Sequence, residues 1–489
     1  MSRDRPNMLM IVVDQMAHDV IAGLGHPCVR TPNLDALLAR GTAFTNAYCS
    51  SPICLPSRMA LMTGRLPRRD DIYDNGSELP ASVPTLAHHL NSAGYTTVLS
   101  GKMHFVGPDQ LHGFTERLTP DLPPAGLDLT PDWTLGPVAN PGTSVDLLRL
   151  PPVQDWSQQL SYDDEVLHTS LASLRRLSRE PGPFFLCASF VHPHDPFLVT
   201  REYWDRYADR DIPPPTVPGP PADHPFVRWI QTHHEADRVP LTEAEVLRAR
   251  RAYYAAVSYV DDVLGTLVRE VERLGLAEET VVVFTSDHGE MLGEHGMWFK
   301  RTFHDGATKV PLVMTVPAAV GGRRRDEIVS LPDLTATLLD LAEVPDRTER
   351  LAGLDGRSLR SVLAGGDGEG GWRDRAVVEY LAEGTIAPML MLRTRRHKYV
   401  YVHGHAPLLF DMVEDPLEQH DRAADPDLAE VRAALHEELV GAVDVDALTE
   451  QVLRSQRERL LTLAGTPPGR SWKLQVTRDA TRLFPRPGS

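Results

Sequence analysis

The sequence predicts an α/β fold in which a mostly parallel central sheet is flanked by helices, with a smaller α+β C-terminal domain. Four short apolar runs, rich in branched residues and bounded by polar residues or proline, predict buried strands at Met8–Val13, Phe184–Phe190, Val281–Phe284 and Val310–Val316. Stretches with helical periodicity lie between them, at Asn33–Arg40, Thr85–Ala93, Tyr162–Leu177 and Thr242–Leu274. Because strand and helix alternate, the helices should cover both faces of the sheet.

The chain has 489 residues, which exceeds the length at which a single hydrophobic core keeps growing. We therefore expect two domains, an α/β domain over residues 1–366 and an α+β domain over residues 373–489 that ends in an extended tail. The glycine-rich segment 364–372 is the predicted linker. The second domain should contain the strands Ala376–Tyr380, Met389–Arg393 and Tyr399–His403 and the helix Asp427–Ala442.

Charge and cysteine content exclude several classes of protein. The chain carries 67 acidic and 50 basic side chains, a formal net charge of −17, which argues against nucleic acid or an anionic membrane as partner. The apolar run at Met8–Val13 is short and no cleavage-type region follows it, so we expect a buried strand and a cytoplasmic protein. The chain has four cysteines, which are too few for a disulfide framework and whose spacing does not fit a zinc site. They are Cys28, Cys49, Cys54 and Cys187.

Cys54 lies in the strongest local signal of the chain. The segment reads Cys54-Leu55-Pro56-Ser57-Arg58 and continues to Leu61-Met62-Thr63-Gly64-Arg65. A sulfur nucleophile stands beside a guanidinium, and Pro56 sets the turn into a helix whose N-terminus attracts anions. A lone cysteine is more often a buried structural residue.

The segment resembles the signature of type I sulfatases, C-x-P-S-R-x-x-x-x-T-G, and matches it completely. These enzymes belong to the alkaline phosphatase superfamily. The resemblance implies that Cys54 is oxidised to formylglycine by a separate formylglycine-generating enzyme, and that the hydrated aldehyde attacks a sulfate ester. The second hydroxyl of the hydrate would then let the sulfated intermediate expel sulfate.

Two pairs of residues that end predicted strands have the chemistry of a divalent-metal site. Asp14 and Gln15 follow the first strand, and Asp287 and His288 follow Val281–Phe284 closely. Carboxylate and amide oxygens suit a hard cation, which favours Ca²⁺, with Mg²⁺ and Mn²⁺ as alternatives. Many sulfatases carry a second Asp and an Asn where this chain has Gln15 and His288, and the imidazole keeps Mn²⁺ open. Alone, an Asp at a strand end is more often a helix cap. By resemblance, the residue made from Cys54 completes the metal site.

Lys102 and His104 lie two apart in an extended segment, so both side chains can reach one anion. The segment Gly101-Lys102-Met103-His104 resembles the G-K-x-H element of sulfatases. A solvated lysine and a chance histidine would be the simpler reading of this segment in isolation.

His192 and His194 also lie two apart after a predicted strand, and His194-Asp195-Pro196 resembles the H-x-P element of the family. We favour His194 as the sulfate contact and keep His192 as a substrate-binding candidate, with a structural loop histidine as the equal alternative. Lys300 stands eleven residues before Pro311, the spacing of the sulfate-binding lysine in sulfatases.

These side chains suit the reaction. Charge that develops on the sulfuryl oxygens would be stabilised by Arg58, Lys102, Lys300 and the metal. His104 is the candidate general base and His194 the candidate general acid.

Within the family the sequence is most similar to the choline sulfatase branch. The similarity lies in Ser100–Arg117, Thr130–Trp133, Tyr162–Glu165 and Glu383–Pro388. It implies an oligomer, a dimer or tetramer, whose tail reaches a neighbouring pocket. It also implies that Trp133 offers a cation–π face and Glu383 a counter-charge. The tail departs from that branch because Lys473 replaces an acid and would repel choline.

The substrate is therefore expected to be a small sulfate ester, either choline O-sulfate or an uncharged or anionic alkyl or aryl sulfate. Two alternatives stay open. A phosphonate monoester or phosphodiester hydrolase of the same superfamily would share the cysteine motif and the metal site. The chain could also be a metal-binding scaffold with an unoxidised Cys54, which the retained Pro56, Arg58, Lys102 and His104 disfavour.

Overall fold

The computed structural model describes residues 5–138, 143–219, 222–317, 319, 321–365 and 371–465. Within these residues the central sheet has nine strands, β1 (Asn7–Val13), β2 (Thr42–Tyr48), β3 (Thr96–Gly101), β4 (Glu116–Arg117), β5 (Phe184–Ser189), β6 (Thr280–Ser286), β7 (Lys309–Val310), β8 (Leu312–Thr315) and β9 (Arg323–Ser330). The α/β class expected from the alternation of strands and helices is confirmed.

The strands run in the order β4-β3-β5-β1-β6-β8-β2-β7, with β9 paired to β2. From β4 to β6 all neighbours are parallel, whereas β8 runs antiparallel to both β6 and β2. The run predicted as one strand at Val310–Val316 is divided into β7 and β8 at Pro311, which has no N–H to give to a ladder. The parallel half of the sheet carries the candidate site.

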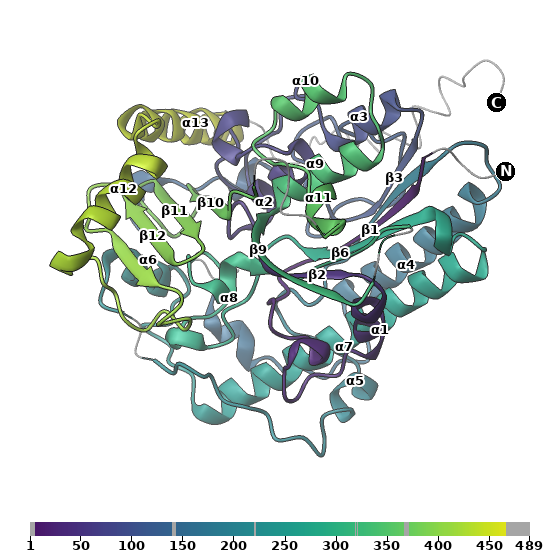
Figure 1. Ribbon diagram of the computed structural model, residues 1–489. Coiled ribbons are helices and arrows are strands. Elements are labelled where there is room, and N and C mark those ends of the chain that lie inside the picture. Colours follow the sequence, from purple (N-terminus) through teal and green to yellow (C-terminus); the bar gives the residue numbers. More distant parts are fainter. Residues whose placement is uncertain are drawn as a thin grey trace.

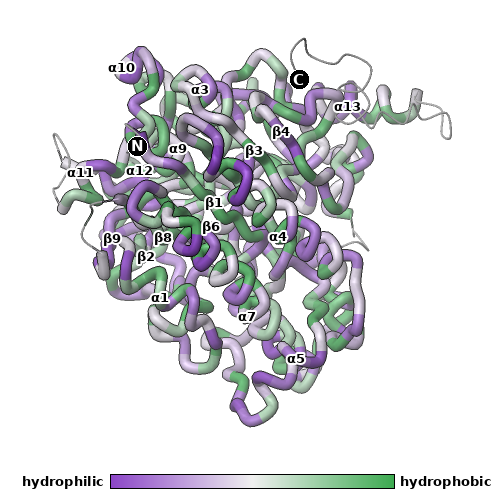
Figure 2. Tube along the Cα trace, turned by 90° about the vertical axis from the view of Figure 1, so that its right-hand side faces the viewer, coloured by the Kyte–Doolittle hydropathy of each residue, from purple (hydrophilic) through white to green (hydrophobic). Residues whose placement is uncertain are grey.

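Both faces of the sheet are covered by helices, as Figure 1 shows. Residues of β1 alternate between two apolar cores: Met8, Met10 and Val12 face one, Leu9 and Ile11 the other. Figure 2 shows the hydrophobic tube around β1 and β6 at the centre of the molecule. The first core is covered by α2 (Cys54–Thr63), α3 (Leu86–Ser92), α9 (Leu331–Leu341), α10 (Arg347–Ala352) and α11 (Arg360–Leu363). On the second face lie α1 (Pro32–Arg40), α4 (Gln158–Leu177), α5 (Arg201–Asp205) and α7 (Glu243–Arg273).

A second sheet is built by the C-terminal part of the chain. Its antiparallel strands are β10 (Arg375–Tyr380), β11 (Met389–Thr394), β12 (His397–Val402) and β13 (Leu408–Asp411). Helices α12 (Ala429–Val440) and α13 (Val445–Gly465) lie beside it in Figure 1. The other α-helices of the described residues are α6 (Pro225–His233) and α8 (Asp305–Thr308). Side chains of β10 and β11 share the first apolar core with the central sheet. The division into domains at residues 366 and 373 stays a prediction, since the two sheets are packed around common side chains.

A buried ion cluster joins the second sheet to the central one. Lys398, on β12, is fully buried, and its ammonium donates to the Phe303 carbonyl, to Asp305 Oδ1 at 2.7 Å and to Glu418 Oε1. Three donors therefore meet three acceptors. The charge of Lys398 opposes the burial that would raise the pKa values of Asp305 and Glu418, and holds both below their usual range.

All four cysteines are buried free thiols. Among the described residues, no helix is long and apolar enough to cross a membrane.

Candidate active site

The two predicted pairs of metal ligands meet at the carboxyl ends of adjacent parallel strands. Val13 of β1 stands opposite Ser286 of β6, so the next residues, Asp14 and Asp287, are neighbours. The backbone amide of Gln15 donates to Asp287 Oδ1 at 3.1 Å, and this hydrogen bond links the two strand ends. This edge of a parallel sheet is where ligands of such folds collect.

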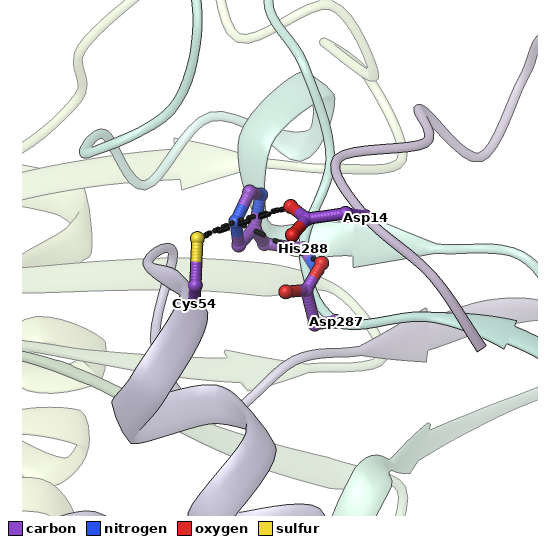
Figure 3. Close-up of side chains that lie close together, drawn as sticks. All are labelled: Asp14, Cys54, Asp287 and His288. Carbon is purple, nitrogen blue, oxygen red and sulfur yellow. Dashed lines mark hydrogen bonds and ion pairs between the residues drawn. The ribbon is translucent and has the colours of Figure 1, made fainter. Parts of the chain in front are cut away.

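Cys54 reaches this edge as the first residue of α2. Its Sγ lies 3.3 Å from His288 Nε2 and 3.8 Å from Asp14 Oδ1. One ligand atom from each of Asp14, Cys54, Asp287 and His288 lies within 4.8 Å of the others, and all four residues are buried (Figure 3). Segments distant in the sequence therefore bring two carboxylates, an imidazole and a sulfur to one point.

The His288 ring is oriented by its other nitrogen. Nδ1 lies 3.1 Å from the Gly289 carbonyl oxygen, which can only accept, so Nδ1 carries the proton. Nε2 faces the carboxylates, 3.7 Å from Asp14 Oδ1 and 3.7 Å from Asp287 Oδ1. A ring held by a backbone carbonyl at one nitrogen, with the other nitrogen toward carboxylates, has the orientation of a histidine that binds a metal.

Arg58, one helical turn after Cys54, is fully buried and bonded to protein on every side. Nε donates to Asp287 Oδ2 at 2.8 Å and Nη2 to Asp14 Oδ2 at 3.1 Å. Nη1 donates to the Lys102 carbonyl and to Ser189 Oγ. This geometry favours a residue that positions both carboxylates, whereas a direct contact of Arg58 with sulfate stays a prediction.

Lys102 follows β3, and its Nζ lies 2.6 Å from Asp14 Oδ2. The next residues turn sharply, because His104 adopts a left-handed conformation with φ of 67°. Asp121 stabilises the turn by accepting from the amides of Met103, His104 and Phe105. Strain of this kind is held at functional sites by surrounding structure. Neither ring nitrogen of His104 has a hydrogen-bond partner of ordinary geometry among the described residues.

Lys300 and His194 meet on the other side of Cys54. Lys300 Nζ lies 2.6 Å from His194 Nε2 and also donates to Gln15 Oε1. The side-chain amide nitrogen of Gln15, Nε2, donates to Asp195 Oδ1 at 2.9 Å and to Glu290 Oε2 at 2.5 Å. Both ends of this amide are thus engaged by protein, so the place of Gln15 among the metal ligands stays a prediction that the geometry does not favour.

Charges around Cys54 favour an anion at its position. Burial would raise the pKa of the thiol, but Lys300, Lys102, His288 and His104 bring it well below its usual value. Burial and Cys54 would likewise raise the pKa of Asp14, but Lys102, His194 and Arg58 lower it below its usual range. Asp14 therefore stays ionised, and the position of Sγ favours an anion.

His192 lies apart from this cluster. Its Nδ1 is 2.7 Å from Asp163 Oδ2 and its Nε2 is 3.2 Å from the Leu198 carbonyl oxygen. Both nitrogens are therefore used, and this geometry favours the structural alternative over a substrate contact. In the segment that follows β5, His194 faces Lys300, whereas His192 faces Asp163 of α4.

A second group of predicted residues lies beside the first. Trp133 is buried, and its Nε1 donates to the Ala382 carbonyl at 2.9 Å, next to Glu383. Glu383 Oε1 accepts from Arg301 Nη2 at 2.8 Å. Arg301 follows Lys300 directly and links the two groups. Lys473 lies outside the described residues.

Several polar residues of the site were not expected from the sequence. Asp121 and Glu290 form internal contacts that no motif reveals, and Asp195 was noted only as part of a histidine motif. Burial raises the pKa of Glu290 to about 7, although amides of Leu292 and Phe299 donate to it. For Arg301 the only signal is its place after Lys300.

The sulfatase family model matches residues 6–344, well over half of the chain. The chain belongs to the sulfatase family. A second family model, described as N-sulphoglucosamine sulphohydrolase, C-terminal, matches residues 293–444. The choline-sulfatase of Rhizobium meliloti (strain 1021) is 37% identical over 506 residues, covering 99% of this chain and 96% of that protein. The arylsulfatase of Clostridium perfringens is 29% identical, with 76% of this chain and 80% of that protein covered.

Among solved structures, the phosphonate monoester hydrolase of Agrobacterium radiobacter has a TM-score of 0.71 and 28% identity, covering 91% of this chain and 96% of that one. The sequence relatives are therefore sulfatases, and the fold is similar to that of a phosphonate monoester hydrolase. The sulfatase resemblance inferred from the Cys54 motif is confirmed, and the protein is a sulfuric ester hydrolase.

Proposed function

We propose that this sulfatase hydrolyses a sulfate monoester to an alcohol and sulfate, with formylglycine made from Cys54 as the nucleophile. The observation that carries the proposal is the position of Cys54. Its Sγ lies 3.3 Å from His288 Nε2, at the point where Asp14 and Asp287 converge and where buried lysines favour an anion. A structural cysteine has no need of such surroundings.

The donor set fits a divalent metal. Two carboxylates and an imidazole, from Asp14, Asp287 and His288, face one point together with the residue at position 54. Oxygen ligands favour Ca²⁺, and the imidazole keeps Mn²⁺ as an alternative, with Mg²⁺ less favoured. When bound, the metal would supply positive charge that stabilises the anionic form of the nucleophile and of the sulfuryl oxygens.

The other side chains of the site would stabilise charge on the sulfuryl group and transfer protons. Lys102 and Lys300 approach the site from two sides and offer fixed positive charge to the sulfuryl group. His104, whose ring nitrogens have no hydrogen-bond partner of ordinary geometry among the described residues, is the candidate base that takes a proton from the nucleophile. His194 shares a hydrogen bond with Lys300 and is the candidate acid for the leaving oxygen.

For the substrate, Trp133 and Glu383 mark the side of the site that would receive the alcohol part. Similarity to a choline-sulfatase makes choline O-sulfate one candidate, and an uncharged or anionic alkyl or aryl sulfate is the other. A formylglycine-generating enzyme is the required partner. A cytoplasmic homo-oligomer, dimer or tetramer, stays a prediction from the resemblance.

A substrate panel on metal-reconstituted protein, checked by mass for the aldehyde, tests the proposal. Aryl sulfate, choline O-sulfate and aryl phosphonate monoester would be compared by kcat/KM, before and after chelation of the metal. We expect sulfate esters to be turned over best and chelation to abolish turnover. A preference for the phosphonate ester would instead favour the alternative that the structural neighbour from Agrobacterium suggests.

A further inference from the structure

Arg301 is buried beside the nucleophile position without belonging to any motif of the sequence. Its side chain is only 3% exposed. Its amide donates to the Pro52 carbonyl at 3.1 Å, two residues before Cys54, and its φ is 74°. Burial would lower the pKa of Arg301, but Glu383, Tyr380 and Cys54 raise it above its usual value.

Some N–H groups of the Arg301 guanidinium have no hydrogen-bond partner among the described residues. Nη2 bonds Glu383, but Nε and Nη1 are buried and find no hydrogen-bond partner of ordinary geometry among the described residues. The Tyr380 hydroxyl lies beside the guanidinium and gives its own proton to the Glu383 carbonyl at 2.5 Å. Buried donors of this kind are nearly always satisfied, because leaving a charged one unpaired is costly. Two unpaired N–H donors on a charged guanidinium suit oxygen acceptors, and the positive charge favours a carboxylate or another oxyanion.

Acids on this side of the site are already paired with arginines. Arg301 holds Glu383, and Arg459 of α13 holds Asp74 through contacts of 2.5 and 2.7 Å. Among the described residues on this side of the site, a quaternary ammonium would meet the positive charges of Lys300 and Arg301 and no carboxylate group that lacks an arginine partner. Glu383 Oε2 is buried without a partner, so one acceptor for a hydroxyl or amine stands beside the two donors.

We propose that Arg301 binds an anionic group in the alcohol part of the sulfate ester. Specificity would then favour sulfate monoesters of hydroxy acids over those of neutral or quaternary-ammonium alcohols. This inference rests on the proposed sulfatase reaction and names its substrate class.

Three phenyl sulfates that differ at the 3-position test the assignment: 3-carboxyphenyl, 3-methylphenyl and 3-(trimethylammonio)phenyl sulfate. Wild type should prefer them in that order. Arg301→Gln should lower kcat/KM for the carboxylate relative to the methyl ester by at least about tenfold, the factor expected for losing one charge-assisted hydrogen bond. The change should lie mainly in KM, because the contact is made to a non-reacting group. The trimethylammonium ester should gain, because Glu383 is released.

Arg393→Gln is the matched control. Arg393 is also a buried arginine, but it lies on β11 and donates to the Tyr48 hydroxyl. The control should leave the order of the three esters unchanged. Arg301→Lys keeps the charge without the fork and should retain part of the preference, which provides a second variant if Arg301→Gln does not fold.

Two results would overturn the assignment. One is a wild type that prefers the trimethylammonium ester. The other is a uniform fall in kcat for all three esters in Arg301→Gln, which would place Arg301 on the sulfuryl group. Failure of the sulfatase reaction itself would appear as no turnover of any ester by aldehyde-bearing protein. Equilibrium binding of 3-hydroxybenzoate needs no turnover, and should weaken in Arg301→Gln but not in Arg393→Gln.

Discussion

Two clusters of buried charge in this molecule differ in how completely their groups are paired. Around Lys398, three donors meet three acceptors, and the cluster is closed. Around Cys54, the ring nitrogens of His104 and two nitrogens of Arg301 have no hydrogen-bond partner of ordinary geometry among the described residues. Arg58 pairs with one oxygen of Asp14 and one of Asp287, and Lys102 pairs with one oxygen of Asp14. Ligand atoms of Asp14, Asp287, His288 and Cys54 still lie within 4.8 Å of one another. A closed cluster of buried charge fixes structure, whereas an open one is organised for a ligand.

The sharpest test of this contrast is to compare two buried thiols. Cys54→Ala should lower turnover by at least about 10⁴-fold, because the nucleophile is lost. Cys187 is equally buried, on β5, and Cys187→Ala should keep its activity. Steady-state turnover with an aryl sulfate measures both. Equal loss in the two variants would mean that Cys54 has no special role.

The two histidines after β5 give the next comparison. His194→Asn should reduce kcat by about 10²- to 10⁴-fold, the range for a general acid. His192→Asn should change kcat much less, but should lower the unfolding temperature, because its Asp163 contact is structural. Kinetics and thermal unfolding of both variants provide the check. A large fall in kcat for His192→Asn without a change in unfolding temperature would instead assign His192 to substrate binding.

Substitutions of three buried lysines should distinguish residues that act in catalysis from a residue that acts in stability. Lys102→Ala and Lys300→Ala should each lower turnover by about 10²-fold or more with little change in unfolding, as expected of electrostatic groups. Lys398→Ala should instead cost about 3–5 kcal/mol of unfolding free energy, because two buried carboxylates lose the ammonium that they share. Wild-type turnover in both active-site variants would show that the anion site is misplaced.

The closed cluster also predicts a dependence on pH. Asp305 and Glu418 have folded-state pKa values below their unfolded values, so their contribution to stability is present above the unfolded values and is lost as the pH falls through the folded ones. The stability difference between wild type and Lys398→Ala should therefore be largest near neutral pH and shrink below about pH 4. Denaturant unfolding across this range would measure it. A difference independent of pH would contradict the ion pairing.

The smallest expected effect concerns Lys473. If the tail lines the pocket, Lys473→Asp should improve kcat/KM for choline O-sulfate relative to an aryl sulfate, by roughly tenfold for each 1.4 kcal/mol of recovered interaction. A wild type that already strongly prefers choline O-sulfate, or an unchanged ratio, would remove the tail from the account of specificity.

The sequence predicted the parallel half of the sheet well because β1, β5 and β6 are continuous apolar runs. It did not reveal β2 or β9, whose partly polar sequences lack such a run, nor the division at Pro311. The antiparallel half depends on tertiary pairing rather than on local pattern.

In the site, strand ends and one motif were enough to bring Asp14, Cys54, Asp287 and His288 together. The sequence could not reveal that the guanidinium of Arg58 bonds only protein groups. Nor could it reveal that two N–H groups of Arg301 have no hydrogen-bond partner among the described residues. Both facts depend on which partners the fold brings near each guanidinium, which residue spacing does not determine.

The central claim is that position 54 acts as formylglycine, and mass analysis of the peptide that contains it tests this most directly. Preparations made with and without a formylglycine-generating enzyme would be compared for the fraction of Cys54 converted from thiol to carbonyl and for specific activity on an aryl sulfate. We predict that activity rises in proportion to the converted fraction and extrapolates to zero without it. Full activity in protein whose Cys54 is entirely thiol would contradict the account.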